Sequence, residues 1–495
     1  MKINYQIIFY FFGILLMFNG GFMFIASILS FIYNDGITDS LIVSGIIVLS
    51  LGAFATIYNR NFDKNLNKRE GYIVVIFGWI VMILSGSIPY FLTNSIDGFT
   101  NIIFETTSGY TTTGATILDS VESLPKGLIF WRSITHWIGG MGIIVLAIAI
   151  LPLLGIGGMQ LFSAESPGPS ADKLHPRITD TAKRLWLIYL SFTLIETLLL
   201  TVFGMSFFDA INHSMSNIAS GGFSTKDSSL AFWNSQPIIQ YIVIFFMLIA
   251  GTNFILLYYV FKGKFNKIKL DEEFNLYFRI ILFFSLIVGL IVFFNSNFLV
   301  SDDISLFSRI EAVVRHSLFQ VVSIVTTTGF VTADYTSWTP FLLLIFFGLM
   351  FFGGSAGSTS GGFKIVRHLL IIKNGFLEFK RILHPSAIVP VRYNNKSVPS
   401  GIIYNILGFF IIYMLSFMVG ALGFSMFGLD FQSALGVSAS SLGNVGPSIG
   451  DYGPMGTFSQ MPVLAKWWAS FLMLVGRLEL FTVLIIFTAY FWKKR

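Results

Sequence analysis

The chain lacks cysteine altogether and is poor in charged residues and histidine. With no cysteine among its 495 residues, disulfides and the thiolate ligands of zinc or haem sites are excluded, and the six histidines are scattered rather than clustered. Only 11% of the residues are charged, against about 25% in an average soluble protein. These shortages argue against a disulfide scaffold, a metalloenzyme and a soluble globular domain.

Hydrophobic residues make up 54% of the chain, which predicts a polytopic membrane protein. The first hydrophobic run, residues 3–33, exceeds the signal-peptide core of about 7 to 15 residues, so we expect a retained helix. It is predicted to be the first of an N-terminal pair within residues 5–58. The net charge of +6 comes from Lys and Arg in short loops, which positive-inside topology explains without a nucleic-acid partner.

Basic clusters divide the rest of the chain and are predicted to mark the cytoplasmic side. Between consecutive clusters, two long hydrophobic helices flank a shorter polar segment that is too short to span a membrane and is predicted to be re-entrant. The polar loops are too small for a nucleotide-binding fold, so we expect neither an enzyme nor a pump that hydrolyses ATP itself. The clusters are residues 59–70, 173–184, 262–269, 363–381, 391–396 and 493–495.

The four re-entrant segments are an internal repeat: residues 102–116, 212–225, 315–331 and 431–448. Because each unit crosses the membrane twice, all four have the same orientation and can close around one axis along the membrane normal. The predicted fold is an all-α polytopic membrane protein with four helix, pore-loop, helix repeats around a pseudo-fourfold pore. The expected divisions are 1–68 for the N-terminal pair, then repeats at 69–172, 173–270, 271–396 and 397–495.

Each re-entrant segment ends in a small, uncharged tetrad: TTTG, ASGG, TTTG or GNVG. Glycine permits backbone conformations that let successive carbonyl oxygens turn toward one point, where they can replace the hydration shell of a monovalent cation. The C-terminal dipole ends of the preceding helices favour the same cation. No ring of Asp or Glu accompanies them, which disfavours a divalent-selective pore. The predicted cation ligands are Thr112, Thr113, Gly114, Ser220, Gly221, Gly222, Thr327, Thr328, Gly329, Asn444, Val445 and Gly446.

The stretch FFGGSAGSTSGGFK, residues 351–364, interrupts an apolar run only about half as long as a span requires. Backbone without helical partners persists at this depth only inside protein or beside water. We interpret residues 353–362, here called the glycine tract, as a gating loop below the filter, with glycines that supply soft dihedral angles and with Ser355, Ser358, Thr359 and Ser360 hydrating the backbone. The predicted gate residues are Gly353, Gly354, Gly357, Ser358, Gly361, Gly362, Lys364 and Arg477.

The composition of the glycine tract also fits two other interpretations. Small residues also allow close helix packing, and this alternative stays open. A phosphate loop is disfavoured, because Phe363 separates the last glycine from Lys364 and the flanks are membrane helices.

Several charged and polar residues lie within apolar segments and need partners or water. Arg477 is predicted to form a positive constriction below the filter, or alternatively to pair with Glu479 or another acid. The others are predicted to be structural, anchoring the re-entrant helices or bonding a neighbouring helix: Glu105, Arg132, His136, His213 and His316.

The repeats and the motifs TTSGYTTTGAT, HWIGGMGIIVLAIAILPLLGIGGMQLFSAESPGP, GGSAGSTSGGFK and GRLEL resemble the TrkH family, the membrane subunit of Trk-type potassium uptake systems in the Trk/Ktr/HKT superfamily. The resemblance covers essentially the whole chain, and the N-terminal pair with SAESPGPSADKLHPRI favours TrkH over the shorter KtrB subunits. It implies uptake of K+ and Rb+ across the bacterial cytoplasmic membrane, with K+ as the transported ion and no organic cofactor. It also implies a homodimer, cytoplasmic termini and a nucleotide-binding regulatory subunit of the TrkA type.

The loops depart from tetrameric potassium channels, since each has one aligned glycine instead of a TVGYG ladder. Discrimination against Na+ is therefore expected to be weaker, and the fourth loop, with Asn444 and Pro447, departs most. Gated conduction, Na+- or H+-coupled symport and Na+-permeable transport stay open as mechanisms. No intramembrane chain of Asp, Glu and His suggests a proton relay, which favours a channel.

Overall fold

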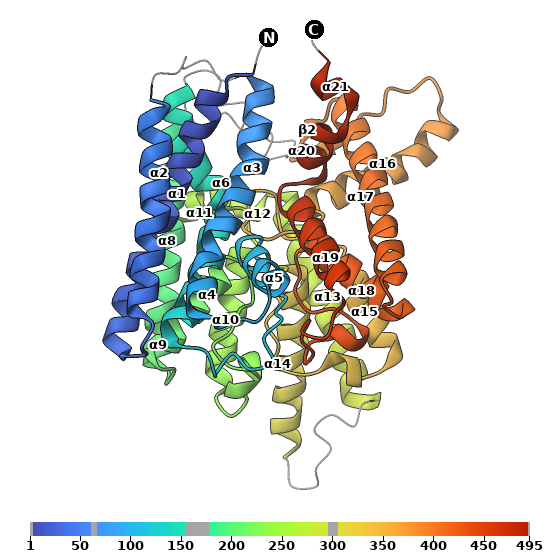
Figure 1. The fold of residues 1–495 in the computed structure, drawn as a ribbon. Helices are drawn as coiled ribbons and strands as arrows, with labels where there is room; N and C mark the ends of the chain where they lie inside the picture. Colours follow the sequence, from blue (N-terminus) through green and yellow to red (C-terminus); the bar gives the residue numbers. More distant parts are fainter. Residues whose placement is uncertain (1–2, 61–66, 155–177, 296–304, 494–495) are drawn as a thin grey trace.

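The computed structural model describes residues 3–60, 67–154, 178–295 and 305–493. Within them, six helices are long and apolar enough to cross a membrane, or up to eight if each bent pair is one span. The helices stand side by side, and α1 begins on the same side of the molecule as α21 ends (Figure 1). The predicted helical membrane fold is confirmed. Most of the SAESPGPSADKLHPRI segment and parts of the basic clusters at 59–70 and 173–184 lie outside the described residues.

The described elements follow the order predicted from the repeats. The N-terminal pair is α1 (Tyr5–Tyr33) and α2 (Thr38–Tyr58). The first unit has α3 (Lys68–Gly86), α4 (Ile88–Thr93), α5 (Phe99–Tyr110) and α6 (Lys126–Leu154). The second has α8 (Ile178–Val202), α9 (Phe207–Ile218), η2 (Ser229–Trp233), α10 (Pro237–Ala250), α11 (Phe254–Phe261) and α12 (Asn266–Lys269).

The last two units contain the remaining elements. The third has α13 (Glu272–Asn295), α14 (Leu306–Val325), η3 (Tyr335–Ser337), α15 (Pro340–Leu349), α16 (Ile365–Leu383) and strands β1 (Arg392–Tyr393) and β2 (Lys396–Ser397). The fourth has α17 (Ser400–Met426), α18 (Phe431–Gly443), η4 (Gly450–Tyr452), α19 (Val463–Arg477), α20 (Leu480–Leu484), η5 (Ile485–Phe487) and α21 (Ala489–Trp492).

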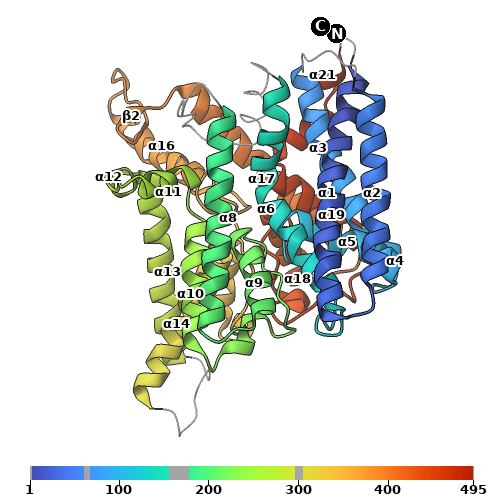
Figure 2. The ribbon, with the colours of Figure 1, turned by 90° about the vertical axis from the view of Figure 1, so that its left-hand side faces the viewer.

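The N-terminal pair lies along one edge of the molecule (Figure 2), where α1 packs on α2, α3 and α6. Most of α1 is apolar, but Asn19 is fully buried in its middle. Asn19 donates to the Ser85 hydroxyl at 2.8 Å and accepts from the Tyr110 hydroxyl at 2.6 Å. Because Tyr110 is the last residue of α5, the pair supports the end of the first pore helix.

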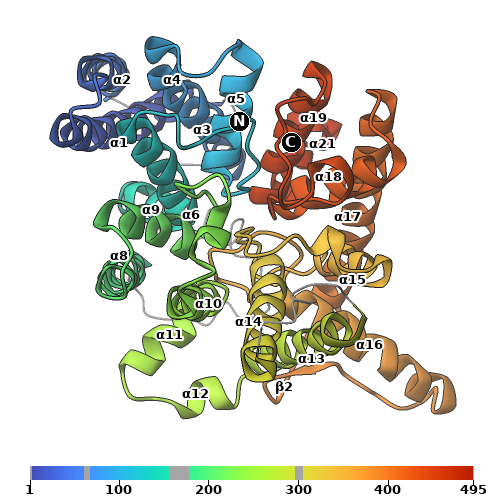
Figure 3. The ribbon, with the colours of Figure 1, turned by 90° about the horizontal axis from the view of Figure 1, so that it is seen from below.

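The four helices that precede the predicted cation ligands, α5, α9, α14 and α18, are here called the pore helices. They surround a common centre, and the units follow one another around it in chain order (Figure 3). Three of them begin at a side-chain cap: Ser206, Ser305 and Asp430 accept from backbone N–H groups of the first turn. Hydrogen bonding by Ser433 holds the pKa of Asp430 below its ordinary value, which keeps this cap ionised.

The second membrane helices are less regular than predicted, because a break was expected in the third unit alone. The axes of α10 and α11 differ by 106°, and α19 is bent by 113° from the segment Leu480–Phe487, which contains α20 and η5. At the first bend the Gly251 carbonyl accepts from Ser355 of the glycine tract at 2.8 Å, so it is lost to its own helix. Asn253 then caps α11. At the second bend Glu479 has a left-handed φ of 60°.

A two-residue hairpin follows α16, where the sequence analysis noted only basic charge. Its strands pair Arg392 with Ser397 and Tyr393 with Lys396. The turn residues Asn394 and Asn395 have φ values of 47° and 63°, as a tight hairpin requires. The hairpin is bound to the start of α13, since the Glu272 N–H donates to Asn394 Oδ1 at 2.9 Å.

Candidate ion-conducting site

The predicted ligands form four backbone triplets of one shape, here called the filter triplets: 112–114, 220–222, 327–329 and 444–446. The first residue of each is left-handed, with φ of 52° at Thr112, 56° at Ser220, 55° at Thr327 and 54° at Asn444. The closing glycines are left-handed too, with φ of 83°, 77°, 81° and 95° at Gly114, Gly222, Gly329 and Gly446, while the middle residue is not. Such alternation turns successive carbonyl groups to one side, whereas a uniform strand points them to opposite sides.

The filter triplets meet in a closed ring. A Cβ atom built on each closing glycine would collide with the middle carbonyl oxygen of the next triplet, so only glycine fits there. The distances are 2.2 Å from Gly114 to Gly221 O, 2.1 Å from Gly222 to Thr328 O, 2.3 Å from Gly329 to Val445 O and 2.5 Å from Gly446 to Thr113 O. The structure thus brings all four predicted loops together, each against its neighbours in chain order.

A serine in each pore helix fixes the triplet that follows it, a regularity the sequence analysis missed. The serine carbonyl accepts from the N–H of the middle triplet residue in all four units. The bonds are Thr113 to Ser108 at 2.9 Å, Gly221 to Ser216 at 2.9 Å, Thr328 to Ser323 at 2.8 Å and Val445 to Ser440 at 3.0 Å. Because the last carbonyl groups of a helix lack an N–H partner within that helix, these serine carbonyls accept from the loop instead. Each serine precedes the aligned glycine by six positions, which was the available signal.

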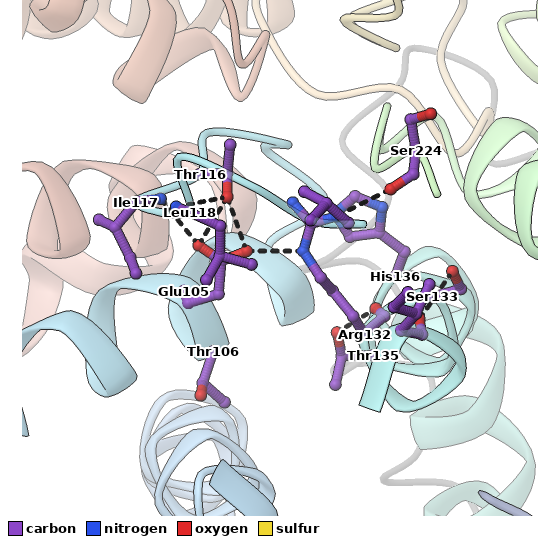
Figure 4. Close-up of polar contacts among 12 residues, drawn as sticks. Glu105, Thr106, Thr116, Ile117, Leu118, Arg132, Ser133, Thr135, His136 and Ser224 are labelled. Carbon is purple, nitrogen blue, oxygen red and sulfur yellow. Dashed lines mark hydrogen bonds and ion pairs between the residues drawn. The ribbon is translucent and has the colours of Figure 1, made fainter. Parts of the chain in front are cut away.

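Buried polar groups brace the segment after the first triplet (Figure 4). Glu105 forms an ion pair with Arg132 at 2.6 Å, and it accepts from the Thr116 hydroxyl and the Ile117 N–H at 3.0 Å each. Arg132 also donates to the Ser224 carbonyl at 3.1 Å. One buried ion pair therefore ties the first loop to the second, in keeping with the structural role predicted for both residues.

Two histidines brace the later loops, each from its own pore helix. His213 Nε2 lies 2.9 Å from Ser224 Oγ, and His316 Nδ1 lies 2.9 Å from Thr332 Oγ1. These two partners lie in the segment after the triplet, and His213 Nδ1 also lies 2.8 Å from the Asp209 carbonyl of its own helix. His136 of α6 bonds Ser216 Oγ at 2.9 Å.

The fourth loop differs in its hydrogen bonding. Ser440 Oγ donates to the Gly446 carbonyl at 2.8 Å, so this carbonyl already has a protein partner. Asn444 Nδ2 donates to Thr113 Oγ1 at 3.0 Å and to the Met473 carbonyl at 2.9 Å. The first side chain of this triplet therefore links the fourth loop to the first.

The glycine tract contacts three of the four filter triplets. The Gly361 N–H donates to Thr327 Oγ1 at 2.7 Å, and Thr359 Oγ1 bonds Ser220 Oγ at 2.9 Å. A Cβ on Gly361 would lie 2.8 Å from the Asn444 Cβ. The tract therefore lies directly against the first residues of these triplets.

Groups outside the glycine tract, in addition to the tract's own hydroxyls, form hydrogen bonds with the backbone of the tract and of the start of α16. Glu273, buried near the start of α13, accepts from the Ala356 N–H at 2.7 Å and the Val366 N–H at 3.1 Å. The Ser358 hydroxyl donates to the Ser355 carbonyl at 2.6 Å. The tract is thus a hydrogen-bonded segment with partners on α13 and at the α10–α11 bend.

The tract's glycines have two different roles, where the sequence analysis gave all five one role. Only Gly357 and Gly362 have left-handed φ values, 74° and 68°. The other three allow close approach: a Cβ on Gly353 would lie 2.3 Å from the Gly361 carbonyl, and one on Gly354 2.4 Å from Ser360 Oγ. These three positions therefore need a small residue because the tract packs closely against itself and against Asn444.

Arg477, the last residue of α19, joins the glycine tract to α6. Its guanidinium donates to the Thr359 carbonyl at 2.8 Å and to the Gly139 carbonyl at 2.7 Å. Glu479 forms an ion pair with Arg367 of α16. Lys364 donates to the Ser360 carbonyl. Two cationic side chains thus donate to adjacent carbonyls of the tract, Arg477 to Thr359 and Lys364 to Ser360.

Comparisons with known proteins agree over nearly the full length. A family profile described as "TrkH: Cation transport protein" matches residues 39–494. The chain is 39% identical over 485 residues to the Trk system potassium uptake protein TrkH of Escherichia coli K12, covering 97% of this chain and 98% of that protein. It is 38% identical over 489 residues to the Trk system potassium uptake protein TrkH of Halomonas elongata, at the same coverages.

A solved structure gives the same result for the fold. The crystal structure of the potassium transporter TrkH from Vibrio parahaemolyticus superposes with a TM-score of 0.88 at 35% identity, covering 99% of this chain and 100% of that one. The expectation that the chain is a transporter rather than an enzyme is confirmed by this kinship. On the profile match, the relatives and the shared fold, the chain belongs to the TrkH family of cation transport proteins.

Proposed function

We propose that the chain conducts K+, and Rb+ as its close analogue, through the ring of filter triplets. The observation that supports this most is the closed contact of each closing glycine with the next triplet's middle carbonyl. Backbone carbonyls in such a ring suit a weakly hydrated monovalent cation. The similar proteins carry potassium uptake in their names, which points to the same ion.

We infer that the glycine tract is the gate and that Arg477 holds it closed. The tract hydrogen-bonds to the second and third triplets, and Arg477 donates to its Thr359 carbonyl. A cation entering from the filter would meet both the tract and the guanidinium charge. Opening would break the Arg477 bond and move the tract aside.

The assembly is also part of the proposal. We infer a homodimer in the bacterial cytoplasmic membrane, with both termini cytoplasmic and a TrkA-type nucleotide-binding subunit as regulator. The shared side of the termini supports this orientation, since the basic helix α16, with Lys373, Lys380 and Arg381, lies toward that side (Figure 1). The units would divide at residues 68, 172, 270 and 396.

Tracer Rb+ uptake into liposomes containing the purified chain tests the function, with Na+ and pH gradients varied independently. We expect uptake that K+ blocks and that neither gradient alters. Uptake seen only with a Na+ or H+ gradient would replace conduction by coupled symport. Uptake that Na+ blocks as well as K+ does would indicate a Na+-permeable transporter.

A further inference from the structure

A buried acid behind the second filter triplet has no counter-charge in the part of the chain that the structure describes. Glu196 lies in the middle of α8, in the apolar run SFTLIETLLLTV, and is 0% exposed. Among the described residues it forms no ion pair, and its hydrogen-bond partner is Asn217, whose Nδ2 donates to Oε1 at 2.5 Å. A carboxylate without a cation is costly at such a place. The sequence analysis passed over Glu196, although an acid inside an apolar run was the signal.

One oxygen of each side chain in this pair lacks a hydrogen-bond partner. Within the described residues, Glu196 Oε2 and Asn217 Oδ1 are both buried without a partner. Asn217 Nδ2 also donates to the Val243 carbonyl at 3.2 Å, which identifies Nδ2 as the nitrogen end of the amide. An ionised Glu196 would leave two acceptors, Oε2 and Oδ1, with no donor between them.

One proton satisfies both atoms. On Oε2 it converts an acceptor to a donor, and Oδ1 of the amide is the acceptor that such a donor requires. A neutral carboxylic acid and a primary amide can form two complementary hydrogen bonds: here the N–H to Oε1 bond that the structure contains, and an O–H to Oδ1 bond that the added proton would supply. We propose that Glu196 is a neutral carboxylic acid that pairs with Asn217 and acts as a positioning residue for the second filter triplet.

The pair acts on the triplet through the last turn of α9. The Asn217 carbonyl accepts from the Ser220 N–H at 2.8 Å, and the adjacent Ser216 carbonyl accepts from the Gly221 N–H at 2.9 Å. Fixing the Asn217 side chain between α8 and α10 therefore fixes the turn that holds two of the three triplet residues. The effect on ion selectivity rests on the proposed function, but the protonation state does not.

Infrared spectroscopy of the purified protein tests the protonation state directly. At neutral pH, the spectrum of the wild type minus that of E196Q should show the C=O stretching band of a protonated carboxylic acid, shifted in D2O. The matched control is E122Q, whose glutamate side chain is 43% exposed and whose difference spectrum should show carboxylate bands. A carboxylate band in the E196Q difference would overturn the proposal.

Selectivity in liposomes tests the positioning role. Because Gln presents the same C=O and an N–H donor in place of the acid O–H, E196Q should discriminate Rb+ from Na+ as the wild type does. E196L removes both bonds and should lose discrimination by about tenfold, the equivalent of one buried polar pair. Equal losses in E196Q and E196L would show that charge is needed and would sink the idea.

A swapped pair guards against a failure of E196L to fold. The double variant E196Q/N217D restores one acid and one amide but not the bond to the Val243 carbonyl, so it should recover the elution profile of the wild type and a larger part of its Rb+ discrimination than E196L keeps. A double variant as defective as E196L would contradict the acid–amide pair. If the wild type itself showed no selective flux, the proposed function would fail while the infrared result stood.

Discussion

The first and third filter triplets differ from the second and fourth in side chains, although all four share one backbone. Triplets 112–114 and 327–329 both read Thr-Thr-Gly. In each, the hydroxyl of the middle threonine bonds the hydroxyl of the threonine just before the triplet: Thr113 with Thr111 and Thr328 with Thr326, each at 2.8 Å. The other two have Gly221 and Val445 in the middle, which carry no hydroxyl. Because the ring follows chain order, the matching triplets lie across from each other.

The difference shows that the backbone of the ring has approximate fourfold symmetry, whereas its side chains have only twofold symmetry. The φ values and glycine contacts repeat four times, while the threonine hydroxyls repeat only twice. The glycine tract lowers the symmetry further, since it bonds Ser220 and Thr327 but leaves Thr112 Oγ1 buried without a partner among the described residues. Separate substitutions can therefore test the fourfold backbone, the twofold threonine hydroxyls and the contacts of the glycine tract.

The largest effect is expected from breaking the fourfold backbone. In Gly222→Ala, the new Cβ would lie 2.1 Å from the Thr328 carbonyl oxygen, and the left-handed φ adds about 1 to 2 kcal/mol of strain. We expect Rb+ over Na+ discrimination to fall by at least about tenfold, or flux to stop, as measured by tracer uptake with competing Na+. Gly114→Ala and Gly329→Ala should behave alike, and Gly446→Ala, at 2.5 Å, more mildly.

A matched control is Gly375→Ala in α16, where a Cβ would meet nothing within 4 Å. It should leave flux and discrimination at wild-type values. Wild-type discrimination in all four ring variants would refute the filter assignment.

The second effect comes from the glycine tract, which acts on one side of the ring. Arg477→Ala removes the bonds from the guanidinium to the Thr359 carbonyl of the tract and to the Gly139 carbonyl of α6, so flux should rise several-fold with unchanged ion preference. Deletion of 355–360 also removes the Thr359 bond to Ser220. That deletion should therefore raise flux and lower Rb+ over Na+ discrimination, because the second triplet loses a support.

Liposome flux of protein that elutes as one symmetric peak measures both changes. Arg381→Ala, on the surface of α16, is the control and should behave as wild type. Unchanged or reduced flux in the folded Arg477→Ala and deletion variants would contradict the gate.

The smallest effect separates the two matching triplets. Thr113→Val and Thr328→Val each lose a hydroxyl bond worth about 0.5 to 1.5 kcal/mol, so discrimination should fall about two- to tenfold. Thr113→Val should be the worse, since Asn444 Nδ2 also loses one of its two acceptors. Competition of Na+ with Rb+ uptake measures the difference. A larger loss in Thr328→Val would show that the link between the fourth and first loops does not matter.

Much of the ring could be predicted because its requirements are local. A glycine that must lie against a neighbouring carbonyl leaves the same mark in each repeat, and aligning Gly114, Gly222, Gly329 and Gly446 located all twelve triplet residues. The bend after α10 could not be predicted, since Gly251 loses its helical hydrogen bond to Ser355, a residue far along the chain. A hydropathy profile contains no information on a hydrogen bond between residues that lie far apart in the sequence.

The buried partners were equally hard to foresee. Arg132 carried an evident need for a counter-charge, but only the fold shows that it reaches Ser224 of the next unit. The hairpin at Asn394 and Asn395 was within reach, because paired asparagines are a recognised turn signal.

The closed ring of glycine and carbonyl contacts is made by one polypeptide. In a pore of four identical chains, every mutation appears at all four corners at once, so a mild defect is multiplied. Here a mutation alters one filter triplet, and the other three are unchanged. Such a ring can change at one corner at a time, and unlike side chains around a common backbone are the expected result of independent substitution in the four repeats.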